Sequence, residues 1–100
     1  MRTFAIVVCH RFDSNYQKRY DKLLELLSTY PEIWMEAPSM FILKTDEEIG
    51  SVEEKIRSAG FQPETDTLLV IDVTEQEAVF AGRIENLARL QAMFQPKMMN

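Results

Sequence analysis

Cysteine is almost missing from this sequence, since Cys9 is the single cysteine among 100 residues. No disulfide can therefore form within one chain, and the fold has to depend on its apolar core. The apolar run at 4–9 is too short for the core of a secretion signal, and no run approaches the roughly 18 residues of a membrane-spanning helix. We therefore expect a soluble protein of the reducing cytoplasm, with no membrane partner.

Glycine and histidine are also scarce, with three glycines and one histidine in the chain. The glycines at 50, 60 and 82 are too widely spaced to form a loop that cradles phosphate groups. One histidine and one cysteine are too few for a zinc site of four protein ligands within one chain. We therefore predict no cofactor and no bound metal.

The net charge is −5, which excludes a uniformly basic nucleic-acid-binding protein. The charges are unevenly distributed, because residues 1–30 carry five basic and three acidic side chains, whereas residues 31–80 carry three and twelve. Four of the basic residues gather around the first predicted helix and are candidates for binding nucleic acid: Arg11, Lys18, Arg19 and Lys22. The alternative is an ordinary solvated helix face.

Four segments have the pattern of β-strands. The continuous apolar run at 4–9 and the strongly apolar run at 67–73 predict strands that are buried on both faces. Two further strand-like runs, at 33–37 and 40–45, flank a Pro-Ser pair at 38–39 that is typical of a turn. The second pair of strands is therefore predicted to form a hairpin.

Two helices are predicted between these strands. The first follows Ser14, which has Gln17 three residues later in a capping-box pattern, and it ends before Pro31. The second carries an apolar stripe at helical spacing and ends near Gly60. The predicted order is strand, helix, strand, strand, helix, strand, which indicates an α+β protein with a ferredoxin-like βαββαβ core.

The pattern weakens after residue 73. Residues 78–81 predict a short C-terminal strand, and residues 84–94 predict a third helix that ends before Pro96. We therefore expect residues 1–96 to form a single domain and residues 97–100 to be a disordered tail.

One face of the predicted sheet needs a cover that the two core helices do not supply. Both helices of a βαββαβ fold lie on the same face. A solvated opposite face would alternate apolar and polar residues, but residues 4–9 and 68–71 are apolar in both registers. The candidates for the cover are the short tail helix and a second subunit. We expect a two-fold homodimer with sheet faces or edges in contact.

Three segments resemble the small proteins known as SinR-like. In that family the hairpin typically reads Trp, several residues, Ser, one residue, an aromatic, two aliphatics and Lys-Thr, and residues 34–45 match this spacing. Residues 15–20 resemble the aromatic start of the family's first helix, and residues 66–71 resemble its last core strand. The family is similar in fold to the small CRISPR-associated adaptation protein and to VapD-type toxin ribonucleases. The resemblance therefore implies a ferredoxin-like homodimer that acts on or binds nucleic acid.

In this wider group an aspartate at the end of the first strand is linked to metal-dependent nuclease activity. Counting back from Tyr16, its place falls on Cys9 or His10, and neither is a carboxylate. The nearest oxygen ligand for a cation such as magnesium is Asp13, in the following loop. We therefore expect no strong nuclease activity, and the question of a weak nuclease or endoribonuclease stays open.

Three residues are candidates for catalysis. His10 can act as a general acid or base near neutral pH, Asp13 is the carboxylate described above, and Ser39 matches the serine of the hairpin motif. Each also has an ordinary explanation as a surface, loop or turn residue. The acidic balance of residues 31–80 favours the alternative, a non-catalytic module that binds a protein partner or regulates one.

Overall fold

The computed structural model describes residues 1–37 and 39–94. It contains four strands, β1 (Arg2–Cys9), β2 (Ile33–Ala37), β3 (Met40–Thr45) and β4 (Thr67–Asp72), and three helices, α1 (Tyr16–Leu27), α2 (Ile49–Arg57) and α3 (Leu87–Phe94). The predicted α+β class is confirmed. In the part of the chain described here, no helix is long and apolar enough to cross a membrane.

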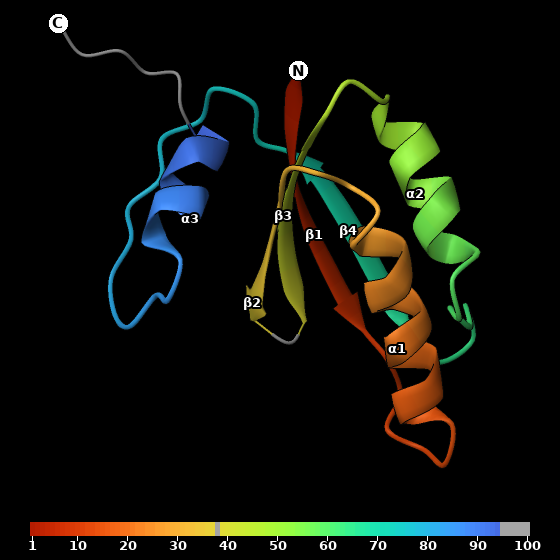
Figure 1. Ribbon diagram of the computed structural model, residues 1–100. Coiled ribbons are helices and arrows are strands. Elements are labelled where there is room, and N and C mark those ends of the chain that lie inside the picture. The colour runs from red at the N-terminus through yellow and green to blue at the C-terminus, as the bar shows by residue number, and fades with distance from the viewer. Residues whose placement is uncertain (38, 95–100) are drawn as a thin grey trace, which may run out of the picture.

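The four strands form one antiparallel sheet in the order β2-β3-β1-β4, with β1 and β3 in the middle (Figure 1). In β1, Ile6 lies opposite Phe41 of β3 on one side and Val70 of β4 on the other. The pairing of β2 with β3 is interrupted by a register shift between positions 34 and 37. The edges of the sheet are therefore β2 and β4, and only the central strands are paired on both sides.

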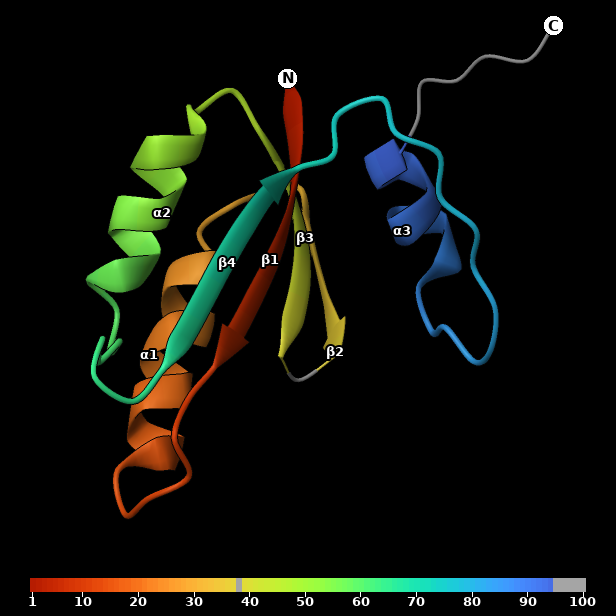
Figure 2. The same ribbon diagram turned by 180° about the vertical axis from the view of Figure 1, so that it is seen from behind.

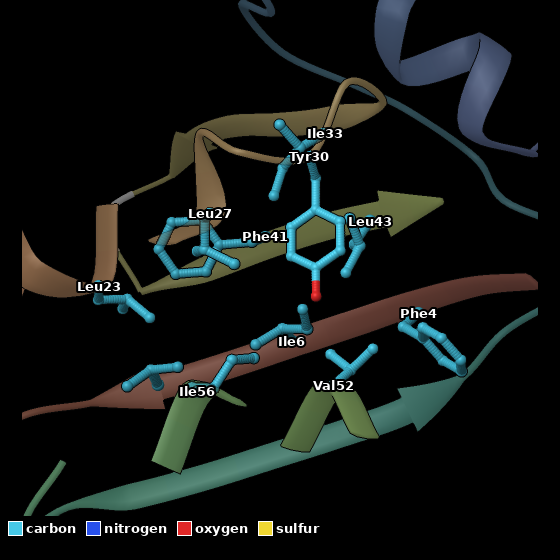
Figure 3. Close-up of a cluster of buried hydrophobic side chains, with 11 residues drawn as sticks. Phe4, Ile6, Leu23, Leu27, Tyr30, Ile33, Phe41, Leu43, Val52 and Ile56 are labelled. Atoms are coloured by element: carbon cyan, nitrogen blue, oxygen red, sulfur yellow. The ribbon is translucent and has the colours of Figure 1, made fainter. Parts of the chain in front are cut away.

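The main core lies between the sheet and the helices α1 and α2, which cover the same face (Figure 1). Alternate residues of β1 and β3 point into this core, as the two-residue period of a strand requires. They pack against apolar residues of α1 and α2 at helical spacing (Figure 3). The buried set is Phe4, Ile6, Val8, Leu23, Leu27, Tyr30, Ile33, Phe41, Leu43, Val52 and Ile56.

The opposite face of the sheet is only partly covered, by α3 (Figure 2). Leu90 and Met93 of α3 pack on Ala5 and Ile42, so the helix shields the side of the sheet formed by β2 and β3. On the β4 side of this face, the exposed fractions of Leu69 and Ile71 are 50% and 44%. The sequence argument that this face is apolar is thus correct, and the tail helix supplies part of the cover.

Two local predictions are wrong. No strand forms at 78–81 within the described residues, because this run extends along α3 rather than along a sheet edge, with Phe80 5.8 Å from Phe94 between ring centroids. The capping box does not form either: α1 begins at Tyr16, and the backbone N–H of Asn15 donates to Asp13 Oδ1 over 2.9 Å. The predicted tail at 97–100 lies outside the described residues.

Candidate nucleic-acid interface at the end of β1 and the start of α1

A buried ion pair organises the end of the sheet where β1 stops and α1 starts. Asp66, one residue before β4, has a fully buried side chain and accepts hydrogen bonds from the guanidinium of Arg19 in α1. The carboxylate also accepts the backbone N–H groups of Arg11 and Gln62, each over 2.8 Å. One carboxylate therefore joins the end of β1, the first helix and the loop before β4.

Asp66 stays ionised in this setting. Burial alone would raise the pKa of its carboxyl group, but the hydrogen bonds from Arg19 and from the two backbone amides outweigh burial and hold the pKa far below its usual range. Arg19 also donates to the carbonyl oxygens of Arg11 over 3.2 Å and Gly60 over 3.3 Å. Arg19 is thus buried in a structural role, whereas three of the four predicted nucleic-acid-binding residues are exposed: Arg11, Lys18 and Lys22.

Aromatic rings form a continuous row beside this ion pair. The rings of Tyr16 and Tyr20, one helical turn apart, are nearly parallel at 4° with centroids 5.9 Å apart. Phe12 lies 5.0 Å from Tyr16, and it is 85% exposed. His10 meets both tyrosines edge-on, at 6.2 and 6.3 Å. The row was not predicted from the sequence, although Phe12, Tyr16 and Tyr20 are spaced four residues apart, a spacing that places side chains on one side of a helix.

His10 is half-buried within this row. Burial lowers the pKa of its imidazole, the charge of Asp66 acts in the opposite direction, and the charge of Arg19 lowers the pKa further. Because the ordinary pKa of histidine is already about 6.5, the neutral ring predominates at pH 7. A neutral imidazole can accept a proton, so His10 keeps the chemistry of a general base.

The other two catalytic candidates, Asp13 and Ser39, are not hydrogen-bonded to His10 in the described residues. Asp13 accepts the N–H of Asn15 through one oxygen, and its other oxygen lies 4.0 Å from the guanidinium of Arg19. Ser39 is exposed in the β2–β3 turn, where its carbonyl oxygen accepts the N–H of Val8 over 3.0 Å. No hydrogen bond joins any two of the three candidates over residues 1–37 and 39–94, and no group of three His, Cys, Asp or Glu side chains there could hold a metal ion.

A groove of about 390 Å³ lies between α1 and the loop that follows α2. Gly60 lines the groove where the loop closely approaches α1, because its φ of +79° suits glycine and a Cβ atom there would stand 3.1 Å from the carbonyl oxygen of Arg19. Sequence analysis placed Gly60 near the end of the second helix and did not anticipate this close approach. The lining residues are Asn15, Lys18, Arg19, Lys22, Gly60, Phe61 and Gln62.

Comparisons of this chain with models of protein families, with curated proteins and with solved structures gave no match.

Proposed function

We propose that this protein binds single-stranded nucleic acid as a small homodimer. The observation that carries the proposal is the row of rings from Phe12 through Tyr16 to Tyr20, with exposed cations on the same stretch of chain. Proteins that bind single strands combine basic side chains, which attract the phosphates, with aromatic rings on which unpaired bases stack. The strongly exposed Phe12 offers such a ring surface at the open end of the row.

The proposed fold is the ferredoxin-like one. The strand order β2-β3-β1-β4, together with two helices on one face, supports this assignment. The resemblance of residues 34–45 to the hairpin of SinR-like proteins supports it independently, and also favours a nucleic-acid-associated role. The net charge of −5 leaves few basic side chains for phosphate contacts, so we expect binding of moderate strength with marked salt dependence.

The proposed dimer uses the part of the sheet that α3 leaves open. Leu69 and Ile71 are exposed on this face, opposite the half-buried Val7 and the buried Ala5 of β1, and β4 lies at the edge of the sheet. A two-fold axis would bring the same apolar strip of two subunits together, which is the usual geometry of homodimers. Such a contact would also shield an edge strand that is otherwise open to aggregation.

We expect no magnesium-dependent cleavage of the bound strand. Metal-assisted hydrolysis needs carboxylates that hold the ion against the phosphate, and one oxygen of Asp13 is already engaged by the start of α1. A metal-free reaction through the neutral imidazole of His10 is the remaining catalytic route.

The test is fluorescence anisotropy with labelled single-stranded RNA and duplex DNA at several salt concentrations. We expect the single strand to bind more tightly, and the variant carrying Arg11→Gln, Lys18→Gln and Lys22→Gln to lose at least tenfold in affinity. Because each phosphate contact contributes a slope of about −0.7 on single strands, the variant's log–log salt dependence should be less steep by about 2.

Arg83→Gln is the matched control for this variant. Arg83 is exposed in the segment before α3, so its substitution changes the net charge without touching the site. If the control loses as much affinity per removed charge as the triple variant does, net charge alone attracts the strand and the interface is refuted. No binding by the folded wild type would favour the alternative, a non-catalytic module that binds or regulates a protein.

A further inference from the structure

The groove between α1 and the loop after α2 has exposed cations that the fold does not use. Lys18 and Lys22 are one helical turn apart on α1, and both line the groove. In residues 1–37 and 39–94, neither ammonium group lies within 4.0 Å of a carboxylate, whereas Lys55 and Arg57 on α2 are both paired with glutamates. Two unneutralised cations at this spacing are suited to a single anionic group.

A close backbone contact and two hydrogen bonds fix the walls of the groove. The close approach of Gly60 to the backbone of Arg19 sets the distance between the loop and the helix. Arg19 donates to the carbonyl of Gly60, and the N–H of Gln62 donates to the buried carboxylate of Asp66. Both neighbours of Phe61 are therefore anchored, so the groove is a preorganised site rather than a gap beside a loose loop.

Two polar groups at the groove lack a protein partner. The Nε of Arg19 is a buried donor with no acceptor among the described residues. Asn15, the N-cap residue of α1, makes no side-chain capping bond, so its amide remains available. The Nε atom is not accessible to solvent, whereas Asn15 is exposed and lines the groove, so the Asn15 amide is the group that can contact an oxygen-rich ligand there.

Phe61 supplies the apolar part of the site. Its side chain is half-buried and lines the same groove as the two lysines. A planar base can stack on such a ring. The volume of about 390 Å³ lies at the lower end of the range for small-molecule sites, roughly 300 to 1,000 Å³. The groove is thus suited to one nucleotide and not to a duplex.

We infer that this groove binds one nucleotide unit, with the phosphate between Lys18 and Lys22 and the base against Phe61. This inference rests on the proposed function, because it places one nucleotide of the bound strand in a defined second subsite beside the Phe12–Tyr20 row. A free nucleoside monophosphate contains the same base, sugar and phosphate as a nucleotide within a strand. Inorganic phosphate contains only the anionic group and lacks the base and the sugar.

The experiment is a titration of the ¹⁵N-labelled full-length protein with inorganic phosphate, with uridine monophosphate and with octauridylate, followed by amide chemical shifts. We expect all three to shift the amides of Lys22, Gly60 and Gln62, with affinity rising from phosphate to monophosphate to octamer. Lys18→Ala with Lys22→Ala should weaken the monophosphate at least tenfold. Phe61→Leu, which keeps most of the side-chain volume, should reduce its affinity to that of phosphate.

Phe12→Leu is the matched control, since it removes an aromatic ring outside the groove. It should weaken the octamer and leave the monophosphate unchanged. If the octamer binds but shifts only residues of the Phe12–Tyr20 row, the groove inference is refuted while the proposed function stands. If none of the three ligands binds the folded protein, both are refuted. If the monophosphate binds no better than phosphate, the role of Phe61 is refuted.

Discussion

The buried carboxylate of Asp66 should be the most sensitive polar position in the molecule. Asp66→Asn keeps the size of the side chain but removes its charge, so the buried guanidinium of Arg19 loses its counter-ion and the amide NH₂ group faces donors. Removal of one partner of a buried ion pair costs about 3–5 kcal/mol. Since a domain of this size is stable by only about 5–15 kcal/mol, this one substitution should remove a large part of the free energy of unfolding.

The effect should depend on pH in a defined direction. The pKa of Asp66 is depressed in the folded protein, so its contribution is fully present above the pKa of an unfolded aspartate, about 3.9, and is lost as the pH falls below that value. The difference in stability between the wild type and Asp66→Asn should therefore be constant from pH 7 to about 5 and should shrink towards pH 2.

Urea unfolding followed by far-UV circular dichroism at pH 7, 5 and 3 measures this difference. Glu53→Gln is the control, because Glu53 pairs with Arg57 on the exposed face of α2, where an ion pair contributes little. A loss of less than about 1 kcal/mol for Asp66→Asn at pH 7, where a buried charge pair should cost several times more, would refute the stabilising role of the Asp66–Arg19 ion pair. A loss that does not change down to pH 3 would show that packing, rather than the charge, is responsible.

Three further predictions follow from the core, the open face and the site. Phe41 is fully buried, so Phe41→Ala should lower the free energy of unfolding by about 3–5 kcal/mol in urea; a loss below about 1 kcal/mol would contradict its place in the core. Light scattering should give twice the chain mass of 11.7 kDa, and Leu69→Glu should shift the protein to a folded monomer; a wild type that is already monomeric refutes the dimer. Purified protein with magnesium should not cut single-stranded RNA, and strong cleavage abolished by Asp13→Ala would overturn this; a rate that survives chelation and is lost in His10→Ala would instead identify a metal-free reaction.

The elements that sequence analysis placed well are those with strong local signals. The hairpin strands at 33–37 and 40–45 match the structure, because two strand-like runs on both sides of a Pro-Ser pair are a strong local signal for a hairpin. The run at 78–81 has the same local composition as a short strand, but a strand also needs a neighbour with free hydrogen-bonding groups. No such partner can be read from the segment itself, and its Phe80 packs on α3 instead.

The candidate site was harder to predict, because it depends on pairings between distant positions. Arg19 was grouped with the basic surface, since nothing near it in the sequence indicates that Asp66, 47 positions away, would bury its charge. The groove likewise needs the loop at 60–62 to meet α1, which only the folded chain shows. By contrast, the exposure of Lys18 and Lys22 followed from their place on the polar side of an amphipathic helix.

The fluorescence of Trp34 reports on one layer of the molecule only, the one that contains α3. It is the single tryptophan, and it packs in the smaller cluster with Phe80 and Ile84 under α3, on the opposite side of the sheet from the main core. Its emission therefore reports the docking of α3, whereas the peptide signal reports α1, α2 and the sheet as a whole. If the smaller cluster opens at lower denaturant than the main core, the two signals will separate, and their difference gives the stability of the α3 layer by itself.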